Sequence, residues 1–256
     1  ANILSGSAHA DRMIPKVIHY CWFGGKPLPK SALRCIASWK KHLPGYEIRE
    51  WNESNFDVDA VRYTREAYDA RKYAFVSDYA RFWVIYNFGG IYFDTDVEVL
   101  RPMDDILAKG PYMGREAGSV LKNVCGQGGD GLAVNPGLGM AAPAGMRIFK
   151  ELLDGYGERA FVNEDGSLNT KTVVAYTSEI LLKYGLSDCN DDTQEVEGIR
   201  IYPSDYFCPA DHTKACIRTL TQNTRSIHHY DASWTGRKHL MRALRLLKRC
   251  VVRITG

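Results

Sequence analysis

The chain has 256 residues, of which 45% are apolar and 25% charged, with 33 Lys and Arg against 30 Asp and Glu. This length and composition are typical of a globular protein with a sizeable core, and they exclude a disordered chain, a collagen-like repeat and a coiled coil. No stretch reaches the roughly 18 apolar residues that a membrane-spanning helix needs, and a net charge of +3 is too small to indicate a nucleic-acid partner.

The predicted elements begin after a polar tail. Residues 1–12 are small and polar, and we interpret them as a tail or a cloning remnant outside the fold. Residues 14–23 are a β-rich apolar run that ends at a Gly-Gly pair, which predicts a strand leading into a turn. Apolar residues recur at helical spacing over 31–42 before a Pro-Gly pair, and residues 46–51 alternate like a second strand.

A long helix is predicted over 65–88, where aromatic residues form a stripe and a glycine follows at the position of a C-terminal cap. Residues 91–100 then form a β-rich run that is interrupted by acidic side chains. Shorter elements are expected beyond it: a strand within 126–145, helices at 146–154 and 174–184, and a strand near 198–202. The alternation predicts an α/β fold in one domain, 13–236, whose sheet binds ligands at the carboxyl ends of its strands.

The most specific feature is the acidic pair Asp94 and Asp96. On a strand, residues i and i+2 point to the same face, so the two carboxylates are expected to project together from one place. Two close carboxylates repel unless a cation lies beside them, and their oxygens suit Mg²⁺ or Mn²⁺. The apolar residues before the pair place it at the end of a buried strand. The alternative is a polar strand terminus that caps a neighbouring helix.

Three polar residues precede the pair on the predicted helix: Ser77, Asp78 and Arg81. Asp78 and Arg81 are three positions apart, so they share a face and can form an ion pair. Two interpretations stay open. In the first, this is a surface ion pair worth less than about 1 kcal/mol. In the second, Arg81 binds phosphate or sugar oxygens while Asp78 holds it or binds a sugar hydroxyl.

Two other positions are candidates for a ligand site. His228 and His229 are adjacent, so on a strand they face opposite ways and at most one joins a given site. Imidazole is a common ligand for divalent ions, and Asp231 lies close by in the sequence, but a core or surface histidine is the competing interpretation. Trp22 follows the first predicted strand, where it is either part of the core or a stacking platform for a nucleobase.

Three motifs occur in order along the chain. They are IPKVIHYCWFGG at 14–25, SDYARFWVIYNFGGIYFDTDV at 77–97 and IHHYDASW at 227–234. Together they closely resemble the DXD-containing sugar transferases of glycosyltransferase family 32. That family includes bacterial capsular and lipopolysaccharide transferases and the yeast initiating mannosyltransferases, and the clostridial glucosylating toxins are distant relatives.

The resemblance implies a GT-A-type fold, with a mixed, mainly parallel central sheet flanked by helices. It implies a metal-dependent retaining glycosyltransferase that uses a nucleotide-sugar donor, with UDP preferred, and Mn²⁺ or Mg²⁺ as cofactor. The acceptor would be a saccharide or a lipid-linked saccharide in surface polysaccharide assembly. In such a reaction a divalent ion and Arg81 stabilise the negative charge on the leaving diphosphate.

The resemblance also implies roles by position. Asp94, Asp96 and Arg81 would carry catalysis. Asp96 and one histidine, His228 in our interpretation of the motif, would bind the metal. His229 and Asp231 stay open as alternatives to His228. The expected donor-binding residues are Trp22, Ser77, Asp78, Tyr92, Ser233 and Trp234.

Two other functions stay open. A haloacid-dehalogenase-like phosphatase would use Asp94 as the nucleophile and Asp96 as acid and base. Its motif normally opens the fold, however, and about 80 residues of the expected domain precede this one. A non-catalytic module would bind a nucleotide sugar with metal but transfer nothing.

The terminal segment 237–256 predicts a basic amphipathic helix with a stripe of apolar residues. It holds seven Lys and Arg and no acidic residue, so the rest of the chain has 26 Lys and Arg against 30 Asp and Glu. Either this helix packs on the domain with its basic face in solvent, or it lies on an anionic membrane surface. The near-neutral total therefore hides a mildly acidic domain and a basic tail.

The cysteines bear on the cellular compartment. Seven widely spaced cysteines without a C-x-x-C pair predict a reducing compartment. No apolar run typical of a signal peptide precedes the first predicted strand. These features predict a cytoplasmic protein, and the basic segment 237–256 adds the expectation that it is peripheral on the inner face of the cytoplasmic membrane.

Overall fold

A computed structural model of the chain describes residues 13–116, 133–187, 192–211, 216–217 and 220–231. The expected tail, the expected basic helix at 237–256 and the expected donor contacts Ser233 and Trp234 lie outside these residues. Within the part of the chain that the structure describes, no helix has the length and apolar character needed to cross a membrane.

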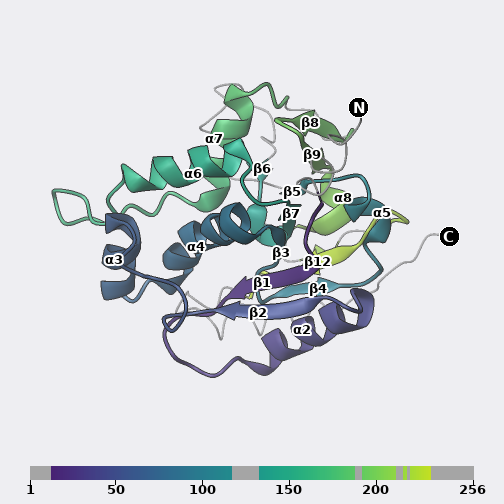
Figure 1. Cartoon of the computed structure of the whole chain (residues 1–256), viewed down its shortest axis with the longest axis horizontal. Helices are drawn as coiled ribbons and strands as arrows, with labels where there is room; N and C mark the ends of the chain where they lie inside the picture. The colour runs from purple at the N-terminus through teal and green to yellow at the C-terminus, as the bar shows by residue number, and fades with distance from the viewer. Residues whose placement is uncertain (1–12, 117–132, 188–191, 212–215, 218–219, 232–256) are drawn as a thin grey trace, which may run out of the picture.

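An eight-stranded mixed sheet lies at the centre of the described residues (Figure 1). Its strands are β1 (Val17–Cys21), β2 (Glu47–Trp51), β3 (Gly90–Tyr92), β5 (Tyr112–Glu116), β6 (Ala133–Val134), β7 (Met140–Ala142), β8 (Gln194–Val196) and β9 (Ile199–Tyr202). The spatial order is β2-β1-β3-β7-β5-β9-β8, with β6 beside β5. Strands β1, β2, β3, β5 and β9 run in one direction, so the sheet is mainly parallel, as predicted.

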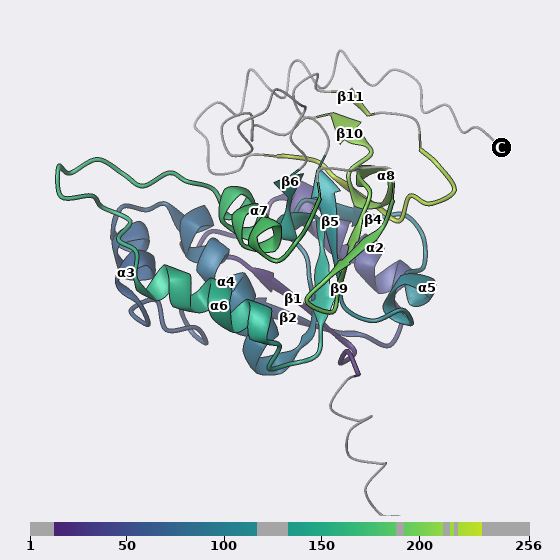
Figure 2. The same cartoon turned by 90° about the horizontal axis from the view of Figure 1, so that it is seen from above.

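Helices cover both faces of this sheet (Figure 2). One layer contains α3 (Arg62–Asp69), α4 (Tyr73–Phe88), α6 (Arg147–Gly157) and α7 (Val173–Lys183). The other contains α2 (Lys30–His42) and the short helices α5 (Asp104–Leu107) and α8 (Ser204–Phe207). Each layer packs on the sheet through its own hydrophobic core. The predicted fold class, a mixed, mainly parallel sheet flanked by helices, is confirmed.

Shorter elements complete the described fold. Strand β4 (Val97–Val99) pairs antiparallel with β12 (Ser226–His228), outside the central sheet. Strand β10 (Ala210–Asp211) pairs with β11 (Cys216–Ile217) in the same sense. A 3₁₀ turn, η2 (Pro136–Leu138), separates β6 from β7. The described part of the glycine-rich stretch, 133–145, which was predicted to hold a strand, thus holds two short strands around a turn.

The helix predicted over 65–88 is wrong in its extent, because the structure has two helices there. The break lies at Arg71, whose φ of 55° is left-handed. The N–H of Lys72 donates to the Ala67 carbonyl at 2.8 Å, and the N–H of Arg71 donates to the Tyr68 carbonyl at 2.8 Å. This is a Schellman cap with arginine in the position that glycine usually takes. The sequence therefore carried no glycine to mark the break.

The end of α4 is set by Gly89, as the sequence predicted. Its φ is 63°, and a Cβ at this position would lie 2.7 Å from the backbone nitrogen of Ala144. Only glycine combines this conformation with such a close approach. β3 begins at the next residue, so the glycine turns the chain directly from α4 into the strand that leads to the acidic pair.

A fully buried histidine on β1 ties three elements together. The indole N–H of Trp51 donates to Nδ1 of His19 at 3.0 Å, and Nε2 of His19 donates to the Gly89 carbonyl at 2.9 Å. The ring is therefore held in its neutral form. Burial lowers the pKa of His19 to about 4, and the bond to Gly89 opposes that shift.

We expect the folded protein to lose stability as pH falls from about 6.5 to about 4, in part because of His19. Its folded-state pKa lies below its unfolded value, so its contribution is present above pH 6.5 and is lost as the unfolded chain takes up a proton. The loss from this one residue is about 3 kcal/mol. Denaturant unfolding of the wild type and His19→Gln across this pH range measures it. Parallel curves for the two proteins would contradict the prediction.

Candidate functional site

The carboxyl ends of β1, β2, β3 and β5 lie at one edge of the sheet, because these strands run in the same direction. Trp22 follows β1 directly, Asp94 lies two residues after β3, and Glu116 is the last residue of β5. Ligands of open α/β sheets bind at this edge. Trp22 and Asp94, which the sequence analysis singled out, therefore lie at the same edge of the sheet as Glu116, which it did not.

Asp94 and Asp96 lie in a turn, so the expectation that strand alternation aligns them is wrong. β3 ends at Tyr92, and β4 begins at Val97. Between these strands the N–H of Val97 donates to the Asp94 carbonyl at 3.0 Å and closes the turn. Aspartate is a poor strand former, which is consistent with a break here. The turn nevertheless brings the two carboxylates to one place.

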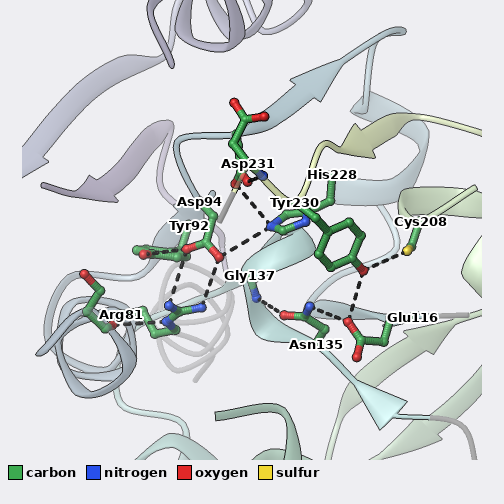
Figure 3. Close-up of polar contacts among 12 residues, drawn as sticks. Arg81, Tyr92, Asp94, Glu116, Asn135, Gly137, Cys208, His228, Tyr230 and Asp231 are labelled. Atoms are coloured by element: carbon green, nitrogen blue, oxygen red, sulfur yellow. Dashed lines mark hydrogen bonds and ion pairs between the residues drawn. The ribbon is translucent and has the colours of Figure 1, made fainter. Parts of the chain in front are cut away.

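The third member of the cluster, His228, lies near the C-terminal end of the described residues, at the end of β12 (Ser226–His228). β12 pairs with β4 so that His228 is opposite Val97, next to the turn. Nε2 of His228 lies 3.2 Å from Oδ1 of Asp96. It also lies 3.7 Å from Oδ2 of Asp94, and Figure 3 shows these two side chains facing each other. His229 contacts Glu98 instead, with Nε2 2.8 Å from a carboxylate oxygen. The two histidines thus have separate partners, as their adjacency predicted.

The electrostatics of this pair favour opposite charges. Burial alone would raise the pKa of Asp96, but the His228 charge and the backbone N–H of Asp231 hold it well below its usual range. Burial alone would lower the pKa of His228, but the Asp96 and Asp94 carboxylates raise it well above its ordinary value. The Asp231 N–H donates to Oδ2 of Asp96 at 2.7 Å. Asp231 therefore reaches the cluster through its backbone.

Arg81 forms a buried ion-pair network on the other side of Asp94. Its Nη2 lies 3.0 Å from Oδ1 of Asp78 and 3.4 Å from Oδ1 of Asp94, and its side chain is only 5% exposed. The interpretation as a surface ion pair is therefore wrong. Burial alone would lower the pKa of Arg81, but the nearby carboxylates raise it. Burial raises the pKa of Asp78 to about 7, although Arg81 opposes the shift.

The remaining described candidates surround this network. The Tyr92 hydroxyl donates to Oδ1 of Asp94 at 3.0 Å, and the Arg81 guanidinium carbon lies 5.1 Å from the centre of the Tyr92 ring. Ser77 accepts the Nε–H of Arg81 on its carbonyl oxygen at 3.1 Å. Trp22 is half-buried, and its indole N–H donates to the Lys26 carbonyl. Trp22 thus lies at the site's edge of the sheet, packed against the core and only partly buried.

The cluster fits a divalent cation. Asp94, Asp96 and His228 each offer one ligand atom, and these atoms lie within 4.8 Å of one another. Nε2 of His228 is buried and makes no hydrogen bond among the described residues, although it approaches both carboxylates. A nitrogen left without a hydrogen-bond partner beside two carboxylate oxygens is the arrangement that a metal ion completes.

Three residues behind the acidic pair were not identified from the sequence. Nδ2 of Asn135 donates to Oε2 of Glu116 at 2.7 Å, and Oδ1 of Asn135 accepts the N–H of Gly137 at 2.8 Å. The Gly137 carbonyl in turn accepts the N–H of Asp94 at 3.2 Å. The only sequence signal for this support was the Asn-Pro-Gly turn that follows an apolar run.

Comparisons with known proteins agree with this site. Residues 29–112 match the family model described as the glycosyltransferase sugar-binding region containing the DXD motif. Two Schizosaccharomyces pombe proteins are similar in sequence. Inositol phosphoceramide mannosyltransferase 1 is 25% identical over 39% of this chain and 33% of its own length. Inositol phosphoceramide mannosyltransferase 3 is 31% identical over 43% of this chain and 32% of its own length.

Among solved structures, the PaToxG glycosyltransferase superposes with a TM-score of 0.47 at 17% identity, over 67% of this chain and 70% of that one. The chain spans about a third of the length of the two yeast relatives. The resemblance to DXD-containing sugar transferases that the three motifs predicted is confirmed by the family match over residues 29–112.

Proposed function

We propose that this chain, which carries the sugar-binding region of DXD glycosyltransferases, transfers a sugar from a nucleotide-sugar donor to an acceptor hydroxyl. One observation carries the proposal. Asp94, Asp96 and His228 converge at the carboxyl edge of the sheet, with the Arg81 guanidinium buried beside them. A divalent ion held by these ligands, Mn²⁺ or Mg²⁺, would supply the positive charge that neutralises the leaving diphosphate.

The chain's own residues carry the rest of the chemistry. The bond between the sugar C1 and the diphosphate oxygen breaks, C1 bonds to the acceptor oxygen, and the proton of the acceptor hydroxyl passes to the leaving diphosphate. Because Asp78 and Asp94 fix Arg81, its charge is held in place before the donor binds, which suits stabilisation of a leaving diphosphate. We also propose a UDP-linked donor and retention of anomeric configuration. The proposed donor contacts are Trp22, Ser77, Asp78, Tyr92, Ser233 and Trp234.

For the acceptor we propose a saccharide or a lipid-linked saccharide of surface polysaccharide assembly. Two observations support a lipid-linked acceptor: the yeast relatives are named for inositol phosphoceramide, and segment 237–256 is basic and amphipathic in sequence. We therefore propose a cytoplasmic protein, peripheral on the inner face of the membrane. Co-sedimentation with anionic vesicles tests this, and equal sedimentation of a protein lacking 237–256 would refute the role of that segment.

A screen of donor hydrolysis tests the central proposal. The protein is incubated with a panel of uridine and guanosine diphosphate sugars and Mn²⁺, and release of the nucleoside diphosphate is measured. We expect release from one donor class, loss of that release with EDTA, and its return with added Mn²⁺ or Mg²⁺. Turnover that EDTA leaves unchanged would refute the metal requirement. Donor binding without turnover, with every acceptor tried, would instead support the non-catalytic module.

The phosphatase alternative has less support from the fold. Its nucleophile would follow the strand that opens the fold, whereas Asp94 follows β3, after β1 and β2. Asp94 also accepts the Tyr92 hydroxyl and faces Arg81 and His228, which suits a ligand better than a nucleophile. A trapped aspartyl-phosphate at Asp94 after incubation with a simple phosphate ester would overturn this judgement.

Gly137→Ala should weaken metal binding. A Cβ at residue 137 would lie 2.1 Å from Oδ2 of Asp94, so the carboxylate would have to move away from its partners. We expect Mn²⁺ to bind at least about tenfold more weakly, measured by electron paramagnetic resonance of free Mn²⁺. Gly157→Ala is the matched control, because a Cβ there meets nothing within 4 Å. Wild-type affinity in Gly137→Ala would contradict the placement of Asp94.

A further inference from the structure

Glu116 joins three separate segments at the back of the candidate site. It ends β5, and its side chain is buried, with only 7% of the residue exposed. One oxygen, Oε2, accepts both the Asn135 amide at 2.7 Å and the Tyr230 hydroxyl at 3.0 Å (Figure 3). No Lys, Arg or His among the described residues forms an ion pair with it. A buried carboxylate that holds two neutral donors from different segments acts as a junction between them.

The first segment that Glu116 holds carries the third ligand. Tyr230 has a left-handed φ of 49°, which residues other than glycine rarely adopt. The residues on either side of it both donate backbone N–H groups to Asp96: His229 to the carbonyl oxygen at 3.0 Å, and Asp231 to Oδ2 at 2.7 Å. Tyr230 lies between these two N–H groups, so its left-handed conformation helps to direct both of them to Asp96.

Tyr230 also packs directly on the ligand histidine. The two ring centroids are 4.2 Å apart, in an edge-to-face arrangement. The Tyr230 hydroxyl at the far end of its ring is the group that Glu116 anchors, and the Cys208 sulfur lies 3.1 Å from it. Anchoring this hydroxyl therefore fixes the ring that supports His228 and the backbone that supports Asp96.

The second segment that Glu116 holds lies behind Asp94. The carboxamide of Asn135 is fixed at both ends, by Glu116 on its nitrogen and by the Gly137 N–H on its oxygen. Gly137 in turn accepts the Asp94 N–H on its carbonyl oxygen. Glu116 is thus connected through short chains of contacts to all three candidate ligands.

We propose that Glu116 is a positioning residue that locks Asp94, Asp96 and His228 into one arrangement before the cation binds. It acts through the Tyr230 hydroxyl on one side and the Asn135 amide on the other. This inference rests on the proposed metal-dependent sugar transfer and adds a residue to it. Glu116 itself contacts neither the cation nor the sugar in this role.

Mn²⁺ binding without any donor tests the inference in the full chain, by electron paramagnetic resonance titration. We expect Glu116→Ala to raise the Kd for Mn²⁺ by about tenfold to a hundredfold, the usual effect of losing a group that orients metal ligands. Tyr230→Phe keeps the ring against His228 but loses the anchored hydroxyl, so it should also weaken binding. Glu116→Gln should stay close to wild type, because its amide oxygen can still accept both hydrogen bonds while the charge is gone.

Three comparisons can overturn the inference. If Glu116→Gln binds Mn²⁺ as weakly as Glu116→Ala, the negative charge and not the junction accounts for the effect. If Tyr230→Phe binds Mn²⁺ with wild-type affinity, the hydrogen bond from the Tyr230 hydroxyl to Glu116 does not position the ligands. If the double variant Glu116→Ala/Tyr230→Phe loses much more affinity for Mn²⁺ than Glu116→Ala alone, Glu116 and Tyr230 do not act through one contact.

A matched pair elsewhere serves as the control. The Tyr184 hydroxyl donates to a carboxylate oxygen of Glu151 between α7 and α6, away from the acidic cluster. Tyr184→Phe and Glu151→Ala should leave the Kd for Mn²⁺ unchanged. Should Glu116→Ala fail to fold, as judged by its near-ultraviolet circular dichroism, Tyr230→Phe and Glu116→Gln still decide the question. Absence of Mn²⁺ binding in the wild type would refute the proposed function, and wild-type binding in every variant would refute only the role of Glu116.

Discussion

Asp96→Asn should reduce sugar transfer and metal-stimulated donor hydrolysis by at least about 100-fold while leaving the fold intact. Asparagine removes the negative charge that a divalent cation requires, but its carboxamide oxygen can still accept the Asp231 N–H that Asp96 accepts at 2.7 Å. The turn around residue 96 is therefore retained. Initial rates with saturating donor, together with Mn²⁺ titration of the same samples, measure the effect.

The control for Asp96→Asn is Asp59→Asn, which removes one carboxylate from an exposed loop before α3. It changes the net charge equally, so any general effect of charge on donor binding appears in both variants. We expect wild-type rates from Asp59→Asn. If Asp96→Asn retained full activity, the acidic pair would not be the site of metal-assisted transfer, and the proposed function would fall.

Arg81→Lys should also lower the transfer rate by at least about 100-fold, although it keeps the positive charge. The guanidinium contacts the Asp78 carboxylate at 3.0 Å, the Asp94 carboxylate at 3.4 Å and the Ser77 carbonyl at 3.1 Å. An ammonium group is a single point and cannot maintain these three directions. We expect the rate at saturating donor to fall more than the Michaelis constant rises, because the lost interaction is with the leaving diphosphate.

The stability of Arg81→Lys should fall by about 2 kcal/mol, because a charged hydrogen bond inside the protein is lost. Urea unfolding measures this. Arg62→Lys is the matched control: Arg62 pairs with Glu66 one turn along α3, but its side chain is 59% exposed. It should change neither stability nor rate measurably. If Arg81→Lys and Arg62→Lys had the same stability and the same transfer rate, the buried ion pairs of Arg81 would contribute no more than an exposed pair.

The main elements of the fold could be predicted from local patterns. The strands at 17–21 and 47–51 and the helix at 30–42 follow apolar alternation and helical spacing, and turn residues mark their ends. The division of the 65–88 stretch into α3 and α4 could not be predicted, because it depends on a left-handed arginine. A helix end of this kind is usually marked in the sequence by glycine, and arginine at the same position gives no such sign.

Only those residues of the candidate site that belong to a recognisable sequence motif could be predicted. The acidic pair stood out in the sequence, but the reason for its alignment is a turn, which strand periodicity did not indicate. The proximity of His228 to this pair depends on the β4–β12 pairing, which no local pattern encodes, and only the family resemblance suggested it. Glu116 and Asn135 had no motif at all, because their importance arises from contacts between distant segments.

The β4–β12 pairing has a consequence for how the protein is made. It joins residues 97–99 to 226–228, and among the described residues His228 is the one that completes the cluster with Asp94 and Asp96. Contacts between such distant positions form late, since the cost of closing the intervening loop must be met first. A ribosome-bound chain that stops before residue 226 would already contain all eight strands of the central sheet but would have an incomplete cation site. Binding of a cation by the nascent protein should therefore begin only when synthesis has passed this strand, which separates folding of the sheet from completion of the candidate cation site.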